Sequence, residues 1–263
     1  MMRITCLAEN TAGRVCCGSE HGLSLYIETN GKRILFDTGA SRLFAENAEK
    51  LGVNLAEVDA AILSHGHYDH GGGLETFFRL NDHAAVYANR NVFEYFMNHE
   101  RYIGLDPKLY DRPRIRFVDD DLYLSDWAEL HTFREKKAVV PILPDGFSVK
   151  RNGVLVPDLF DHEQYLLIHE QGKRILISGC SHKGILNIMD WCTPDVFVGG
   201  FHLFRLDIQK EGTELLKKTA AALLQYQTEY YTCHCTGTEQ YAILKERMGE
   251  RLHYIAAGDV ITI

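Results

Sequence analysis

The chain has 263 residues, 28 basic and 36 acidic side chains, and a formal net charge of −8. This length can bury a sizeable core in one domain, whereas the acidic balance argues against a nucleic-acid binder, which would need a basic face. No apolar run approaches the roughly 20 residues that span a bilayer, and residues 1–22 contain no apolar signal segment. We therefore expect a cytoplasmic protein whose partner is a small molecule, not a nucleic acid or a membrane. The sequence leaves the oligomeric state open.

Cysteine and histidine are the two informative residue types. The seven cysteines are an odd number and are scattered along the chain. Without a secretory segment, this pattern indicates reduced thiols in a cytosol, not a disulfide framework. The chain also has 13 histidines, and their positions in the sequence show whether they form a cluster.

The first half of the chain alternates strand and helix signals. Residues 23–28 and 33–37 are β-rich and flank Asn30-Gly31, which predicts a hairpin with a tight turn. Residues 42–51 have helical spacing, and residues 60–63 are continuously apolar, as in a strand buried on both faces. A helix at 74–79 and a strand at 84–87 follow.

The middle of the chain is less regular. Residues 91–102 are expected to form a helix. The charged and aromatic stretch at about 100–146 is interpreted as a variable insertion in a single domain of residues 1–263, with short strands at 115–118 and 122–124. The insertion could be a lid over a site or a surface segment without a ligand role. Residues 147–156 predict another hairpin, which turns at Asn152-Gly153.

An internal repeat links the two halves. Residues 25–36 align without gaps on residues 166–177, and seven of the 12 positions are identical. A helix candidate, a buried strand and a histidine-bearing loop follow in the same order in each half. We therefore expect an α/β fold (α+β in some schemes), built from two β-β-α-β halves with two sheets face to face and helices outside.

The histidine cluster follows the buried strand at 60–63. His65, His67, Asp69 and His70 fall within six residues and precede three glycines, which give the backbone the freedom to turn sharply. Imidazoles and a carboxylate are ligands for zinc, and also for iron or manganese. The sequence predicts a metal site here.

The histidine cluster and several other short segments resemble motifs of a known family. His-x-His-x-Asp-His after a buried strand, with Asp37-Thr38-Gly39 upstream, resembles the signature of the metallo-β-lactamase superfamily, whose fold is a four-layer αββα sandwich. The segments 21–24, 178–182, 199–203 and 233–237 resemble one branch. That branch comprises metal-dependent hydrolases similar to 7,8-dihydropterin-6-methyl-4-(β-D-ribofuranosyl)aminobenzene-5′-phosphate synthase.

The resemblance implies a ligand set for one or two divalent ions, zinc first, with iron or manganese as alternatives. His65 and His67 would bind the first metal, and Asp69, His70 and His234 the second. The remaining histidine ligand is assigned to His182. At the strand end where the superfamily has a bridging aspartate, this chain has Cys180. Three roles stay open for it: a metal ligand, a residue that contacts a ligand, or a strand-end residue without a role in the site. Asp37 is expected to hydrogen-bond a ligand histidine, and His202 to contact a ligand or the substrate.

The expected activity is hydrolysis by metal-bound hydroxide, since a divalent metal lowers the pKa of bound water. Asp69 is the candidate catalytic residue, which would orient the water and pass on its proton. The resemblance implies a phosphorylated or pterin-like substrate, and Lys183, Arg205 and Lys210 could contact an anionic group. Two alternatives stay open, an iron-dependent oxidoreductase of the thiol dioxygenase type and a non-catalytic metabolite sensor.

Overall fold

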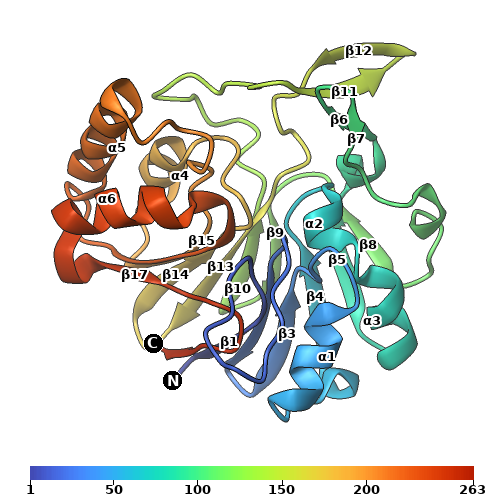
Figure 1. The fold of residues 1–263 in the computed structure, drawn as a ribbon. Helices are drawn as coiled ribbons and strands as arrows, with labels where there is room; N and C mark the ends of the chain where they lie inside the picture. Colours follow the sequence, from blue (N-terminus) through green and yellow to red (C-terminus); the bar gives the residue numbers. More distant parts are fainter.

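Two seven-stranded β-sheets pack against each other and carry helices on both outer faces (Figure 1). The structure is a computed structural model that describes residues 1–263. The first sheet has the order β18 (Val260–Thr262), β1 (Arg3–Ala8), β2 (Ser24–Thr29), β3 (Lys32–Phe36), β4 (Ala60–Leu63), β5 (Ala85–Asn89) and β8 (Ile115–Val118). The second has the order β17 (Leu252–Tyr254), β16 (Glu229–Thr232), β15 (Val196–Gly199), β14 (Lys173–Ile177), β13 (Tyr165–Glu170), β10 (Ala128–His131) and β9 (Leu122–Ser125).

The two sheets have the same topology, as the internal repeat predicts. From β18 to β8, the first sheet has three antiparallel pairings and then three parallel ones. From β9 to β17, the second sheet repeats that order. The register repeats as well, because Leu25 pairs with Phe36 in one half and Leu166 with Ile177 in the other. The expected duplicated αββα sandwich is confirmed.

Alternation of side chains along the strands separates three apolar layers. Alternate residues of β3 and β14, such as Ile34 and Ile175, face the core between the sheets. The intervening residues Leu35 and Leu176 face the helices instead. Helices α1 (Leu43–Lys50) and α3 (Leu74–Leu80) cover the first sheet. Helices α4 (Ile185–Cys192), α5 (Lys210–Leu223) and α6 (Thr238–Met248) cover the second.

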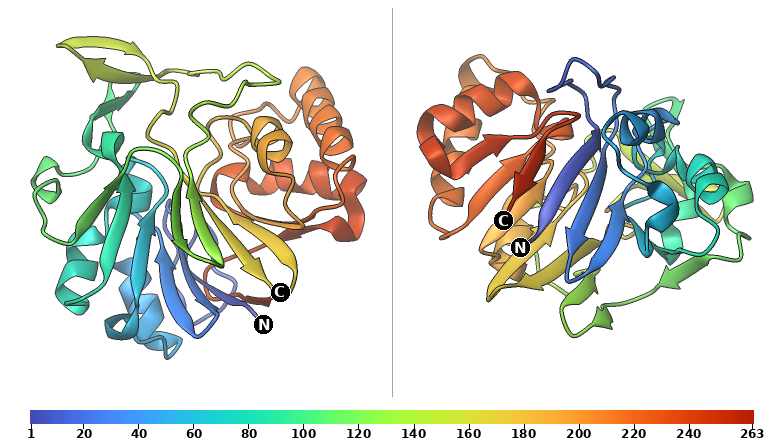
Figure 2. Two further views of the ribbon diagram at one scale, coloured as in Figure 1. Left: turned by 180° about the vertical axis from the view of Figure 1, so that it is seen from behind. Right: turned by 90° about the horizontal axis from the view of Figure 1, so that it is seen from below.

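A third, four-stranded sheet lies over one end of the sandwich (Figure 2, left). It comprises β12 (Val154–Pro157), β11 (Phe147–Arg151), β6 (Tyr95–Asn98) and β7 (Arg101–Tyr102). The helix expected at 91–102 is therefore wrong, because only the short 3-10 turn Arg90–Phe93 is helical and β6 follows it. The cause is tertiary, since β6 pairs with β11 and Phe96 is buried against Val149 in a small apolar cluster.

The stretch expected as an insertion takes part in both central sheets. β8 closes one edge of the first sheet, and β9 and β10 extend the second. Trp127 packs against the core between the sheets. β9 and β10 occupy the places that β18 and β1 hold in the first sheet, so these strands complete the duplicated topology.

None of the helices has the length and apolar character needed to cross a bilayer.

Candidate metal centre

The candidate ligands lie just beyond the carboxyl ends of parallel strands in both sheets. These ends meet at one edge of the sandwich, the usual place for a site in sheets of this kind. The residues that follow each strand are Asp37 after β3, His65 to His70 after β4, Cys180 and His182 after β14, His202 after β15, and His234 after β16. Short helix α2 (Tyr68–Gly71) carries Asp69 and His70.

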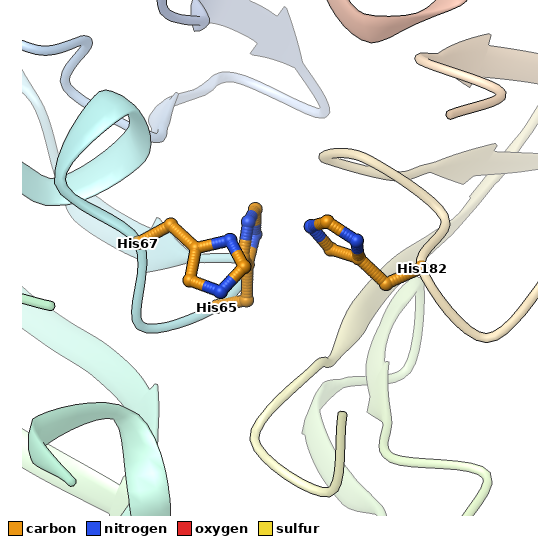
Figure 3. Close-up of side chains that lie close together, drawn as sticks. All are labelled: His65, His67 and His182. Carbon is orange, nitrogen blue, oxygen red and sulfur yellow. The ribbon is translucent and has the colours of Figure 1, made fainter. Parts of the chain in front are cut away.

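A first group joins His65 and His67 of one half to His182 of the other (Figure 3). One ligand atom from each of the three lies within 4.8 Å of the other two. All three rings are buried, yet Nε2 of His65, Nε2 of His67 and both ring nitrogens of His182 have no hydrogen-bond partner. Buried polar atoms without partners are costly in a folded protein. These nitrogens therefore fit a bound metal ion.

Protonation also favours metal binding at this group. Burial, reinforced by neighbouring imidazoles, holds the pKa of His65, His67 and His182 well below the ordinary histidine value. The rings are therefore neutral near pH 7 and present a lone pair, the form of imidazole that binds a metal.

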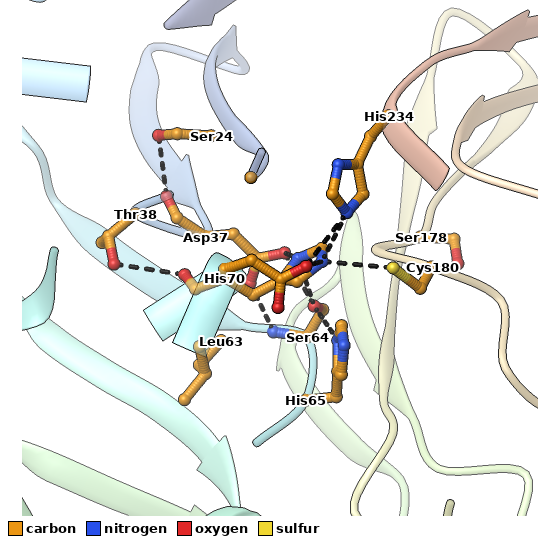
Figure 4. A network of polar contacts seen from close by, with 12 residues as sticks. Ser24, Asp37, Thr38, Leu63, Ser64, His65, His70, Ser178, Cys180 and His234 are labelled. Atoms are coloured by element: carbon orange, nitrogen blue, oxygen red, sulfur yellow. Dashed lines mark hydrogen bonds and ion pairs between the residues drawn. The ribbon is translucent and has the colours of Figure 1, made fainter. Parts of the chain in front are cut away.

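A second group lies beside the first and combines Asp69, His70 and His234. Nε2 of His70 is 3.2 Å from Nε2 of His234. Oδ2 of Asp69 is 3.4 Å from the same His234 atom and 3.9 Å from Nε2 of His70. Figure 4 shows His70 and His234 pointing toward each other across the two halves. The structure thus brings together the second set of residues singled out in the sequence.

Cys180 lies between the two groups. Its Sγ is 3.2 Å from Nε2 of His70 and belongs with His65 and His70 to one cluster of candidate ligand atoms (Figure 4). It also clusters with His182 and His202. Burial raises the pKa of the Cys180 thiol well above its ordinary value. Gly179 permits this close approach of the halves, because a Cβ there would lie 2.3 Å from Oγ of Ser64.

Asp37 positions His70, a candidate ligand of the first half. Its Oδ2 is 2.6 Å from Nδ1 of His70, and its two oxygens accept hydrogen bonds from the backbone N–H and the hydroxyl of Ser64, each at 2.7 Å. Burial alone would lower the pKa of His70, but the carboxylates of Asp37 and Asp69 raise it. Because Nδ1 of His70 is held by Asp37, Nε2 faces the second group.

Two buried glutamates position the candidate ligands of the second half, and the sequence did not reveal either. Oε1 of Glu163 accepts the backbone N–H of His182 at 2.8 Å, and Oε1 of Glu9 accepts that of His234 at 2.6 Å. Neither residue lies in a motif. Glu9 is separated from His234 by 225 residues, so no local pattern could have identified this contact.

Asn10 connects His234 to a further histidine that sequence reasoning had not placed in the site. Oδ1 of Asn10 accepts a hydrogen bond from Nδ1 of His234 at 2.7 Å, and its Nδ2 donates to Nδ1 of His21 at 3.3 Å. Nε2 of His21 is in turn 3.3 Å from Oδ2 of Asp69. With these bonds, Nε2 of His234 carries no proton and is free for a metal. Nε2 of His21, in contrast, carries the proton and faces Asp69.

The remaining histidines near the centre differ in availability. Both ring nitrogens of His202 lack partners, and its ring centroid is 4.2 Å from that of His182. His162, in contrast, accepts a hydrogen bond from the Gly66 N–H at 3.0 Å and contacts Asp158 at 3.1 Å. His202 is thus free for a ligand or a substrate, whereas the hydrogen bonds of His162 support the loop that carries His65 and His67.

Backbone strain marks the same strand ends. Asp37, Ser181, His202 and His234 adopt positive φ angles of 60°, 59°, 53° and 50°. Residues other than glycine rarely adopt this conformation, and such strain concentrates at functional sites.

A cavity of about 220 Å³ opens above both groups. His67, Asp69, Cys180, His182, His202 and His234 form its floor, and His21, Arg101, Phe147, Phe204 and Arg205 are among its other lining residues. Of the three cations considered from the sequence, only Arg205 lines this cavity. Lys183 is buried and donates to the carbonyl of Thr132 at 2.6 Å, and Lys210 lines a separate surface hollow.

The chain matches the sequence profile of the metallo-beta-lactamase superfamily over residues 18–219. The chain belongs to the metallo-β-lactamase superfamily. It is 30% identical to the 7,8-dihydropterin-6-methyl-4-(beta-D-ribofuranosyl)-aminobenzene-5'-phosphate synthase of Methanocaldococcus jannaschii, over 99% of this chain and 96% of that protein.

Solved structures agree with this membership. Tm1679, a metal-dependent hydrolase of the β-lactamase superfamily, is 30% identical and superimposes with a TM-score of 0.84 over 100% of this chain and 99% of that one. The Zn²⁺-bound PqqB of Methylobacterium extorquens, 11% identical, shares the fold with a TM-score of 0.62 over 99% of this chain and 100% of that one. Members of this superfamily bind divalent metals, and the clustered donors of this metallo-β-lactamase-like chain fit that property.

Proposed function

We propose that this protein is a metal-dependent hydrolase that acts on a small, phosphorylated or pterin-like substrate in the cytoplasm. One observation carries the proposal: unpartnered, buried imidazole nitrogens from both halves converge at the floor of an open cavity. A structural metal site is closed by its ligands, whereas a catalytic site leaves room for water and substrate.

The donors divide into two sets. His65, His67 and His182 would hold one ion, and Asp69, His70 and His234 a second. Nitrogen and carboxylate donors suit zinc first, with iron or manganese as the alternatives. Cys180 occupies the strand end where the superfamily has a bridging carboxylate, and its sulfur lies within reach of both sets. We propose that it is the shared ligand.

A divalent ion at this centre would supply an acidified water and a positive charge next to the reacting group. The chain itself supplies proton handling and orientation. Asp69 lines the cavity, and burial, which would raise its pKa, is outweighed by His70, His21 and His234, which hold the pKa well below its ordinary value. The carboxylate is therefore ionised and can orient a water through a hydrogen bond, and we propose that it also takes up the proton of that water. The contact with His21 fixes one of its oxygens.

The substrate class rests on two supports. The archaeal relative is named for a product that carries a phosphate and a pterin, and the similar solved structure is described as a hydrolase. Arg205 at the cavity rim supplies a positive charge that suits a phosphorylated substrate.

Metal analysis and structure determination test the proposal. Protein purified without added metal is expected to contain one or two zinc ions per chain, and anomalous scattering at the zinc, iron and manganese edges would locate them and show whether Cys180 is a ligand. Activity on a panel of esters, lactones and phosphodiesters is expected for the wild type and for His83→Ala, an exposed histidine outside the site, and is expected to be absent in His67→Ala.

Two results would contradict the hydrolase proposal. Stoichiometric iron with thiol-dependent oxygen uptake would indicate a thiol dioxygenase that uses the same ligand residues. Tight metabolite binding without turnover on the whole panel, lost in His67→Ala, would indicate a sensor.

A further inference from the structure

Two arginines stand at the rim of the catalytic cavity, and they come from different parts of the fold. Arg101 lies on β7 of the third sheet, and Arg205 lies in the loop after β15. The guanidinium of Arg101 lies over the ring of Tyr68 at 4.8 Å, and that of Arg205 lies over Phe147 at 4.7 Å and Phe204 at 5.6 Å. Aromatic faces thus set the orientation of both cations.

Both arginines retain unused hydrogen-bond donors. Arg101 makes no ion pair and no side-chain hydrogen bond, although the chain as a whole is acidic. Arg205 contacts Asp145 through Nη1 alone, at 2.7 Å from the carbonyl and 3.3 Å from the carboxylate. A guanidinium carries five N–H donors, so Nε and Nη2 of Arg205 are available to a ligand.

A second, larger cavity lies next to the catalytic one. It measures about 970 Å³ and shares His182, His202 and Arg205 with the smaller cavity. Its lining includes the apolar side chains of Leu186, Leu206 and Leu215. The catalytic cavity of about 220 Å³ has room for a small polar group only, whereas the larger one has the size of an ordinary ligand pocket.

We propose that the two cavities together bind an organic phosphate ester, an inference that rests on the proposed function and assigns the two parts of the substrate to separate cavities. The phosphoryl group occupies the small cavity between Arg101 and Arg205, and a flat or apolar group occupies the larger one. A phosphoryl group has enough oxygens to face the metal-binding side chains and two guanidinium groups at once, whereas a carboxylate has only two.

Calorimetric binding to the metal-loaded protein tests the phosphate site. The probes are methylphosphonate and 1-naphthylmethylphosphonate, which cannot be hydrolysed at a P–O ester bond, and 1-naphthylacetate, which has the same ring with a carboxylate. Arg101→Ala and Arg205→Ala are each expected to weaken both phosphonates by about tenfold or more. Arg247→Ala, on the exposed face of α6, is the matched control and is expected to bind like the wild type.

The same titrations test the apolar compartment. The naphthyl phosphonate is expected to bind at least about tenfold more tightly than methylphosphonate and than naphthylacetate. Leu215→Glu, at a half-exposed position on α5 that tolerates a charge, is expected to abolish the advantage of the naphthyl ring and to leave methylphosphonate unaffected.

Metal content measured on the same samples separates the two proposals. If the protein holds its metal but the arginine variants bind phosphonates like the wild type, or the naphthyl ring adds no affinity, this inference is overturned and the hydrolase proposal stands. A wild-type protein that holds no metal overturns both.

Discussion

At the residue scale, the partner of each ring decides what a histidine can do. His70 and His234 each use Nδ1 for a hydrogen bond, to Asp37 and to Asn10, and their two Nε2 atoms thereby face each other at 3.2 Å. His162 uses both nitrogens and has none left for a metal. The sequence shows only that these residues are histidines, whereas the second bond of each ring comes from a distant segment.

Asp37→Asn tests this dependence on a neighbouring carboxylate. The amide would point either an N–H group or a weaker acceptor at Nδ1 of His70, so we expect metal affinity to fall about 10- to 100-fold. Competition with a chromophoric chelator measures the affinity. Asp195→Asn, a change at a partly exposed carboxylate that binds the backbone of Arg174, is the control. Equal affinities in the two variants would show that Asp37 does not orient His70.

At the element scale, each half has an aspartate that joins two neighbouring parallel strands. Asp59 precedes β4 and binds β3, and Asp195 precedes β15 and binds β14. Oδ2 of Asp59 accepts the backbone N–H of Arg33 at 2.8 Å, and Oδ2 of Asp195 accepts that of Arg174 at 2.7 Å. Arg33 and Arg174 are equivalent in the internal repeat. The duplication therefore extends from the hydrophobic pattern to individual hydrogen bonds at the start of β4 and β15.

The pH dependence of stability follows for Asp59. Burial alone would raise its pKa, but hydrogen bonds from Nζ of Lys32 and from the Arg33 N–H outweigh it and hold the pKa below the ordinary value. A lowered pKa in the folded state stabilises the fold above the unfolded pKa of about 3.9, and this contribution is lost as the pH falls through the folded value. Asp59→Asn is thus expected to cost up to about 1 kcal/mol at pH 7, a modest effect because the carboxylate is partly exposed, and almost nothing near pH 2.

Urea unfolding of both proteins at pH 7 and at pH 2 measures this difference. A cost of Asp59→Asn that stays constant over that range would show that the ionised carboxylate does not account for the stabilisation.

At the scale of the whole molecule, the centre lies where the two halves meet. His65 and His67 come from the first half and His182 from the second, so a bound ion would link the sheets in addition to their shared apolar core. Binding to the folded state alone stabilises it, by about 2.7 kcal/mol when the free ligand is at 100 times its Kd. For a chain of this length, this corresponds to roughly 5–10 °C in Tm.

Chelation is therefore expected to lower the Tm of the wild type by about that amount, and zinc to restore it. Differential scanning calorimetry measures the shift. His67→Ala, without a complete first group, is expected to respond much less to the chelator. Identical midpoints of the wild type with and without chelator would argue against an ion that joins the halves.

The sequence by itself determined the features that short-range patterns encode. The repeat at 25–36 and 166–177 predicted the duplicated sandwich, and the run from His65 to His70 supplied the candidate ligands of the first half. These features follow from local periodicity and from side chains a few residues apart. His182 and His234 were assigned only by resemblance, because each lies far from the cluster in the chain.

Only the tertiary structure decided the rest. Residues 95–98 form a strand because β11 is there to pair with them. Glu9 and Asn10 directly follow β1. They reach the centre because the packing of the two sheets places the end of β1 beside the loop after β16. Arg101 faces the cavity because the third sheet covers that end of the sandwich. Each of these contacts is between segments far apart in sequence, and its free energy exists only after the chain has folded.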